Sequence, residues 1–208
     1  MGGNRLSRAY HSTVIGITRV HKSWLWCLLT ATLFLNSYSA CAPEPPLSQS
    51  ALDFRVRTLR DFEQLTLMLG PAWNSENSFA TAGGVIRDFL LDLHGKGRHV
   101  LGLGVLDPSG KYLVGYRIDD TAPGSIRKSG YEDMSFASFK GVDEVVSSRK
   151  IVQVPLYFME QKVLVIGAPL IKEDRLLGIM CLSFDTEKFE KEYGINEQEF
   201  LKIDFNIR

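Results

Sequence analysis

The sequence is poor in cysteine and histidine and has no surplus of either charge. Its 208 residues include three cysteines and four histidines, and 24 basic residues balance 24 acidic ones. Two histidines, His94 and His99, flank the turn GKGR, but two lone imidazoles do not supply the ligands that a zinc site needs. No Ser/His/Asp or Cys/His set can be assembled from the sequence. We therefore expect no metal, no cofactor and no enzymatic activity.

The charges are unevenly distributed along the chain. Residues 1–40 hold four basic residues and no acidic one, so in a neutral chain the rest carries a net charge of −4. A mildly acidic body has no basic surplus with which to replace the counterions of a phosphate backbone. This composition argues against a nucleic-acid partner.

The sequence also lacks a clear membrane-spanning run. The apolar stretch WLWCLLTATLFL, residues 24–35, would form a helix of about 18 Å, whereas the hydrocarbon core of a bilayer is about 30 Å thick. Basic residues, a short apolar stretch and then small residues are typical of a secretory signal peptide. We interpret residues 1–40 as that signal. An uncleaved signal anchor is the alternative, because the stretch can be extended through Ser and Asn to Ala42.

Cys41 follows Tyr38, Ser39 and Ala40, an order that resembles the bacterial lipobox, in which the cysteine is acylated and becomes the mature N-terminus. Tyr38 departs from that pattern, which prefers Leu, Val or Ile, and ordinary cleavage after Ser39 is the alternative. Lipidation would leave Cys181 as the only thiol in the fold, so we expect no disulfide. The proline-rich residues 41–50 then form an extended tether, and residues 51–208 form a single domain.

Apolar periodicity predicts helices at both ends of this domain. Spacings of three and four predict a helix over 52–69, ended by Gly70-Pro71, and a second over 79–93 behind an Asn74/Ser75 cap. The tail from Thr186 predicts one or two short amphipathic helices, with Asp185 as the N-cap.

Between these helices the period changes to that of strands. Two runs flank the turn PSG, and three more are separated by the short polar segments MEQ and KED, which favour antiparallel hairpins. The two central runs are apolar at both parities, so both faces of the sheet should be covered. Pro169 should lie at a bulge or face an edge, and Cys181 should be a small core residue. The expected strands are 99–107, 111–119, 151–158, 162–171 and 175–184, and segment 119–149, with short helices at 132–139 and 142–148, should cross one face of this five-stranded antiparallel sheet.

Two paired stretches resemble Cache domains, the extracytoplasmic sensor relatives of PAS domains. They are VLGLGVLDPSGKYLVGYRID and IGAPLIKEDRLLGIMCLSFD, and the resemblance spans about residues 52–186. It implies an α+β, PAS-like fold in which a small molecule, often an organic acid or amino acid, binds between the sheet and the crossing segment. Such domains usually precede a membrane helix and a kinase or chemoreceptor output, which does not follow here.

The candidate ligand-binding residues lie on or beside the crossing segment. Arg127 presents a planar fork that matches a carboxylate, and Tyr131 adds a hydroxyl. The family often has a basic residue followed two positions later by an aromatic one, but the gap here is four. Tyr116, Arg117 and Tyr157 on the strands are further candidates, although Arg117 is expected to be mainly solvated. Tyr131 could equally serve only to pack the crossing segment on the sheet.

The sequence leaves two functions open. The favoured one is a lipid-anchored extracytoplasmic sensor that binds a small carboxylate or amino acid and signals through a separate receptor or kinase. The alternative is a structural or assembly lipoprotein that uses a PAS-like fold for protein contacts, with the crossing segment packed shut.

Overall fold

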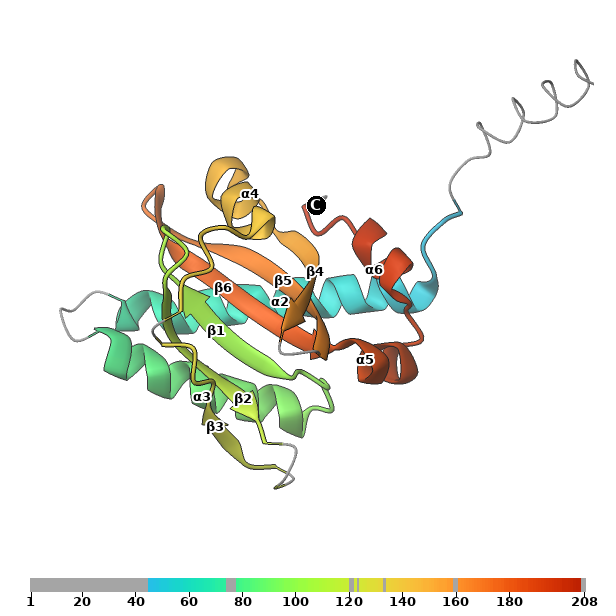
Figure 1. The fold of residues 1–208 in the computed structure, drawn as a ribbon, viewed down its shortest axis with the longest axis horizontal. Helices are drawn as coiled ribbons and strands as arrows, with labels where there is room; N and C mark the ends of the chain where they lie inside the picture. The colour runs from blue at the N-terminus through green and yellow to red at the C-terminus, as the bar shows by residue number, and fades with distance from the viewer. Residues whose placement is uncertain are drawn as a thin grey trace, which may run out of the picture. The chain divides into compact units, whose positions relative to one another are not determined.

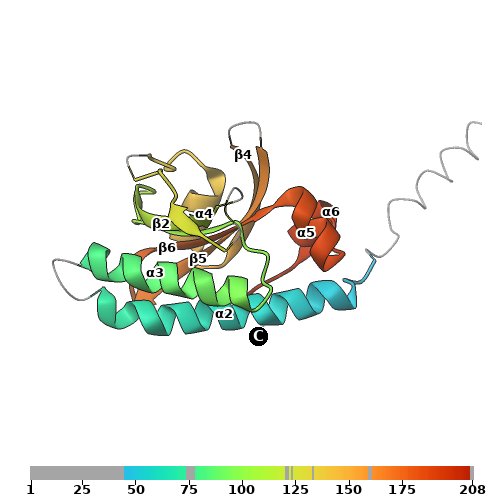
Figure 2. The same ribbon diagram turned by 90° about the horizontal axis from the view of Figure 1, so that it is seen from below.

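The computed structural model describes residues 45–73, 78–119, 122, 124–132, 134–158 and 161–206. The predicted signal peptide, Cys41 and the Asn74/Ser75 cap lie outside the described residues. Residues 47–208 form one compact unit. An antiparallel sheet stands at its centre, with two long helices, α2 and α3, on one face and the short helix α4 on the other (Figures 1 and 2).

Helix α2 extends further than its apolar stripe predicts, from Gln49 to Ala72. Ser48 caps its N-terminus by accepting a hydrogen bond from the Ala51 amide. Pro71 lies inside the last turn, whereas the sequence predicted that Gly70-Pro71 would end the helix. Proline normally excludes a helical conformation from the preceding residue through its clash with that residue's backbone and Cβ. Gly70 has no Cβ, which reduces this clash and lets the helix continue.

Helix α3, Ser78–Gly95, lies beside α2 beneath the sheet (Figure 2). A Cβ added at Gly83 would lie 3.3 Å from a methyl group of Val114 and 3.4 Å from the hydroxyl of Tyr116, both on the sheet. The glycine therefore lets α3 approach the sheet closely. Its neighbour Gly84 faces open space.

The sheet has six strands, not the five predicted, in the spatial order β3-β2-β1-β6-β5-β4 with every pair antiparallel. The additional strand is the edge strand β3, which lies within the crossing segment and has only three residues, too few for a periodic pattern. The strands are β1 Gly102–Leu106, β2 Tyr112–Ile118, β3 Ile126–Lys128, β4 Val152–Phe158, β5 Gln161–Lys172 and β6 Arg175–Asp185.

The predicted turn between the last two strands is confirmed, as is the prediction that Pro169 lies at a bulge or faces an edge. Glu173 and Asp174 join β5 to β6 with positive φ angles of 48° and 61°, the backbone of a tight hairpin turn. Pairing of β4 with β5 stops at Gly167, so Pro169 has a hydrogen-bonding strand only on the β6 side. The register shifts one residue further on, after Leu170. A residue without an N–H is accommodated at such a position.

The crossing segment is less helical than predicted. Helix α4, Lys140–Ser148, matches the expected 142–148 helix, but no helix forms among the described residues of 132–139. That stretch instead follows the loop after β1: the Phe136 amide donates to the Gly110 carbonyl, and Lys111 bridges to Ser135. Its backbone hydrogen bonds are thus made with a distant loop, which local periodicity does not reveal.

The main core lies between the two long helices and the sheet. Phe54 of α2 is fully buried at its centre, with the rings of Phe184, Phe189 and Tyr193 within 5.0–5.6 Å of its own. The last two come from helix α5, Thr186–Tyr193, which is capped by Asp185 as predicted. Helix α6, Glu197–Lys202, adds the buried Phe200. All of this core lies within residues 47–205, so this part of the chain has the core of an independent domain.

Candidate ligand-binding site

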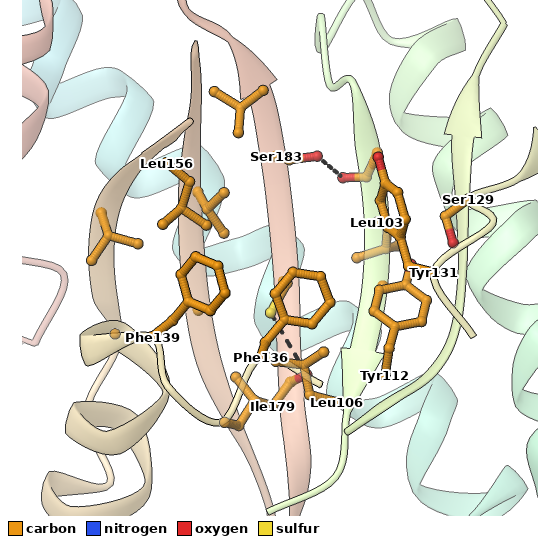
Figure 3. A pocket seen from close by; sticks show the side chains of 18 of the residues that line it. Leu103, Leu106, Tyr112, Ser129, Tyr131, Phe136, Phe139, Leu156, Ile179 and Ser183 are labelled. Carbon is orange, nitrogen blue, oxygen red and sulfur yellow. Dashed lines mark hydrogen bonds between the residues drawn. The ribbon is translucent and has the colours of Figure 1, made fainter. Parts of the chain in front are cut away.

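A cavity of about 200 Å³ lies on the face of the sheet opposite α2 and α3. Its floor is formed by five strands, and its roof by the crossing segment and α4 (Figure 3). This is the place where the sequence analysis expected a pocket. A cavity of this size suits a small-molecule ligand.

The floor is hollow because one row of the sheet carries only small residues. Gly115, Gly104, Cys181 and Gly167 are neighbours in register on β2, β1, β6 and β5, and we call them the small row. Successive side chains of a strand point to opposite faces. The large residues next to the small row in sequence, such as Leu103 and Leu182, therefore point into the helix-side core. The small row itself faces the cavity with three glycines and one cysteine.

The small row also determines where Tyr112 lies. An added Cβ would be 2.5 Å from the Tyr112 hydroxyl oxygen at Gly104 and 1.9 Å from it at Gly115. Real Cβ atoms essentially never approach this closely, so the phenol lies flat over the two glycines. Burial raises the pKa of this phenol far above its ordinary value, which Ser129 opposes. Tyr112 is thus a neutral wall of the cavity.

Aromatic rings of the crossing segment close the roof. The Tyr131 ring meets the Tyr112 ring edge-on at 5.6 Å, and Phe136 lies 6.0 Å from Tyr112 and 5.4 Å from Phe139. Figure 3 shows these rings standing over the strands that form the floor. Such edge-to-face pairs add packing energy beyond the area they bury. Val145 of α4, fully buried, packs with Ile179 and Val152 at one end.

The polar side chains of Arg117 and Ser183 lie on the same face of the sheet, two residues along each strand from the small row. Arg117, Gly102, Ser183 and Val165 are neighbours in register on β2, β1, β6 and β5, and we call them the polar row. Arg117 is the only charged residue among the described residues that line the cavity. Its Nε is buried and has no hydrogen-bond partner in the described part of the chain. The Ser183 hydroxyl donates to the Gly102 carbonyl at 3.2 Å and keeps its lone pairs available.

Three of the five predicted residues border the cavity. Tyr131 lies in the roof, and Arg117 lies in the polar row, half-buried rather than mainly solvated as expected. Tyr116 borders the cavity, but its side chain packs against the helix-side core near Gly83. Strand alternation explains this difference, because Tyr116 pairs with the core residue Leu103.

The other two predicted residues lie outside the cavity lining. Arg127 is exposed on β3, opposite Arg117 but one strand further from the cavity. Tyr157 is 74% exposed on the edge strand β4, where its ring lies 5.4 Å from the Lys162 ammonium. Leu156, the preceding residue, lines the cavity, so the side chain of Tyr157 points to the opposite face of the sheet. Residue type alone could not tell a strand face or a sheet edge, so the sequence-based selection included both positions.

Cys181 also differs from its prediction. It was expected in the core, but it lies on the cavity floor and is only half-buried. Burial against apolar groups raises the pKa of its thiol to about 12, so the thiol is protonated and unreactive near neutral pH. Its Sγ lies 4.0 Å from the Ile179 carbonyl oxygen (Figure 3).

The sequence analysis missed Tyr112, Ser183 and the small row. The glycines were visible in GLG at 102–104 and in VG at 114–115, and glycine inside a strand often marks the close approach of another group. What the sequence did not contain was the register that aligns these glycines across strands. Within the described ranges, no three His, Cys, Asp or Glu side chains gather as a metal site. None of the helices described there is long and apolar enough to cross a bilayer.

No protein-family profile matches the chain, and no curated protein matches it. Among solved structures, the sensory domain of the Campylobacter jejuni chemoreceptor Tlp3 is similar, with a TM-score of 0.52 and 14% identity over 68% of this chain and 57% of that chain. Its ligand-binding domain with L-valine matches with a TM-score of 0.52 and 14% identity, over 76% of this chain and 69% of that chain. The same domain in complex with 4-methylisoleucine matches with a TM-score of 0.52 and 14% identity, over 68% of this chain and 55% of that chain.

These matches extend over little more than half to about two thirds of the chemoreceptor domain. At this level of identity they establish the arrangement of helices and strands. The chain therefore has the α+β, PAS-like fold of Cache sensor domains.

Proposed function

We propose that residues 47–206 form an extracytoplasmic sensor domain that binds a small organic acid or amino acid in the cavity. The observation that carries this proposal is the cavity itself. It is lined mostly by apolar groups, with one cation and a few hydroxyls among them, the usual composition of a small-molecule site. The structurally similar chemoreceptor domain binds L-valine and 4-methylisoleucine, which supports a ligand of this size.

A thermal-shift screen of small carboxylates and amino acids on the 47–208 segment tests this proposal. A ligand at 100 times its dissociation constant stabilises the folded state by about 2.7 kcal/mol, or roughly 5–10 °C for a domain of this size. Gly167→Val is the matched variant, because its methyl groups would fill the small row. It should abolish the shift, whereas Gly84→Val, in open space on α3, should leave it unchanged.

The result would contradict the proposal if no compound in a broad screen gave a shift, or if Gly167→Val left the shift intact. If no compound gives a shift, the alternative function takes its place: a structural lipoprotein that uses the fold for protein contacts.

We also propose that Cys41 carries the lipid that holds the domain at the membrane. The support is the sequence Ser39-Ala40-Cys41 behind a basic and then apolar segment. Labelled palmitate should be incorporated into the full-length protein in cells and should be absent from Cys41→Ser. Cys27→Ser is the control, because that residue lies within the predicted signal. Unchanged labelling and membrane retention of Cys41→Ser would refute the anchor.

A sensor domain outside the cytoplasm needs a route for its signal, and we propose a separate receptor or kinase as the partner. The support is that the similar sensory domain belongs to a chemoreceptor. Crosslinking of the membrane-bound protein, with and without the ligand found in the screen, should trap one partner in a ligand-dependent way. A crosslinking pattern that is indifferent to the ligand would argue against signal transfer by that contact.

A further inference from the structure

We propose that the cavity selects an apolar monocarboxylate and discriminates against the amino acid of the same shape. This inference rests on the proposed function and names its ligand class. It comes from the charges and the shape of the cavity, which differ from what a zwitterion needs.

The described residues that line the cavity carry one positive charge and no negative charge. Arg117 is the only ionised group among the 25 residues that form the walls. A carboxylate beside it forms a neutral pair, and the guanidinium supplies paired hydrogen bonds. An amino acid would also bring an α-ammonium into the cavity, and this group would lose its water on entering. The described walls contain no Asp or Glu carboxylate to pair with it. An ion taken from water without a partner costs several kcal/mol.

The hydrogen-bonding groups of Arg117 are available to a ligand. No ion pair or hydrogen bond within the described chain engages this side chain, and its Nε is already out of contact with water. A buried donor without an acceptor is costly, so a carboxylate oxygen that reaches Nε removes this cost. Ser183, in the same polar row, would have to release the Gly102 carbonyl before its hydroxyl could donate to the same carboxylate.

The shape of the floor places the apolar part of the ligand. From the polar row, the small row lies two residues further along each strand, about 6.6 Å away. Cys181 and Gly167 leave the space there, beside the Tyr112 ring that covers Gly104, and the end of the space is closed by Ile179 and Val145. A Cβ added at Gly167 would touch the methyl groups of those two residues at 3.5 and 3.4 Å. A short branched alkyl tail would make the same contacts.

Three probes that share one carbon skeleton test the inference by calorimetry on the 47–208 segment. Isovalerate has the carboxylate alone, L-valine adds the ammonium, and isovaleramide has neither charge. We expect isovalerate to bind at least tenfold more tightly than either of the others. Equal or tighter binding of L-valine would overturn the inference while leaving the proposed function in place. Absence of binding by all three, and by the wider screen, would remove both.

Matched variants test the two ends of the ligand. Arg117→Met should weaken isovalerate about 10- to 150-fold, the range for losing hydrogen bonds to a charged group. It should leave isovaleramide, which carries no charge, within about threefold. Arg127→Met, its exposed cross-strand neighbour, should change neither. Gly167→Ala should weaken isovalerate more than acetate, because acetate has no tail to reach the small row. Unaltered isovalerate binding in Arg117→Met, with the folded state verified by its melting temperature, would refute Arg117 as the anchor.

Discussion

Adding one methyl group at Gly104 tests the small row, because the Tyr112 ring occupies the space it would need. The new Cβ of Gly104→Ala would lie 2.5 Å from the phenol oxygen and 2.9 Å from two ring carbons. The ring cannot simply swing away, since Tyr131 and Phe136 pack against its other side. Overpacking of this kind costs about 1–3 kcal/mol, and we expect the free energy of unfolding to fall by that amount.

The assay is urea denaturation in two backgrounds, the natural sequence and Tyr112→Leu. Leucine removes the phenol oxygen and the clashing ring carbons, so Gly104→Ala should then cost little, with a coupling energy of about 1–3 kcal/mol. Gly115→Ala is the contrasting variant, because its Cβ would also lie 2.8 Å from the Gly104 Cα and from the Leu103 carbonyl oxygen. It should stay destabilising in both backgrounds.

Equal costs of Gly104→Ala in the two backgrounds, within about 0.5 kcal/mol, would refute the reasoning. They would mean that the ring does not lie over the glycine pair. A change in the denaturant slope, rather than in the midpoint alone, would point instead to an altered unfolded state.

Three further predictions concern stability and reactivity. Gly84→Ala should raise the free energy of unfolding by about 0.5–1 kcal/mol, because the methyl group meets open space in a helix, whereas Gly83→Ala, which faces β2 at 3.3 Å, should gain less; equal gains in urea denaturation would contradict the close approach. Arg98→Met should cost about 3 kcal/mol, because it leaves the partly buried carboxyl of Asp61, 2.7 Å away, unpaired. Since burial already raises the pKa of Asp61 despite Arg98, protonation at low pH favours the folded state, and the deficit should be smaller at pH 4 than at pH 7. Alkylation of Cys181 in the 47–208 segment should still accelerate about tenfold per pH unit at pH 10, because its thiol pKa is about 12; a plateau near pH 9, as for an exposed thiol, would show that the cavity floor is open to water.

The sequence alone contained most of the element order. Apolar runs bounded by turn residues located five strands to within three residues at each end, because each run is long enough to stand out from the polar segments around it. Short polar separators required antiparallel hairpins, and the capping role of Asp185 followed from its side chain and position. The crossing segment was recognised by its lack of period, and a cavity beneath it was expected from the resemblance to Cache domains.

The composition of the cavity was decided by tertiary structure. Arg117 and Arg127 are alike in sequence and pair with each other across two strands, yet only Arg117 lies over the cavity because β3 is the sheet edge. Cys181 is flanked by apolar residues, and only strand parity places its thiol on the floor rather than in the core. The small row itself exists because register aligns Gly104 and Gly167 with Cys181 from three separate stretches of chain. The register of β5 with β6 follows from their tight hairpin turn, whereas β1 and β6 pair across a long stretch of chain, so no local pattern aligns Gly104 with Cys181.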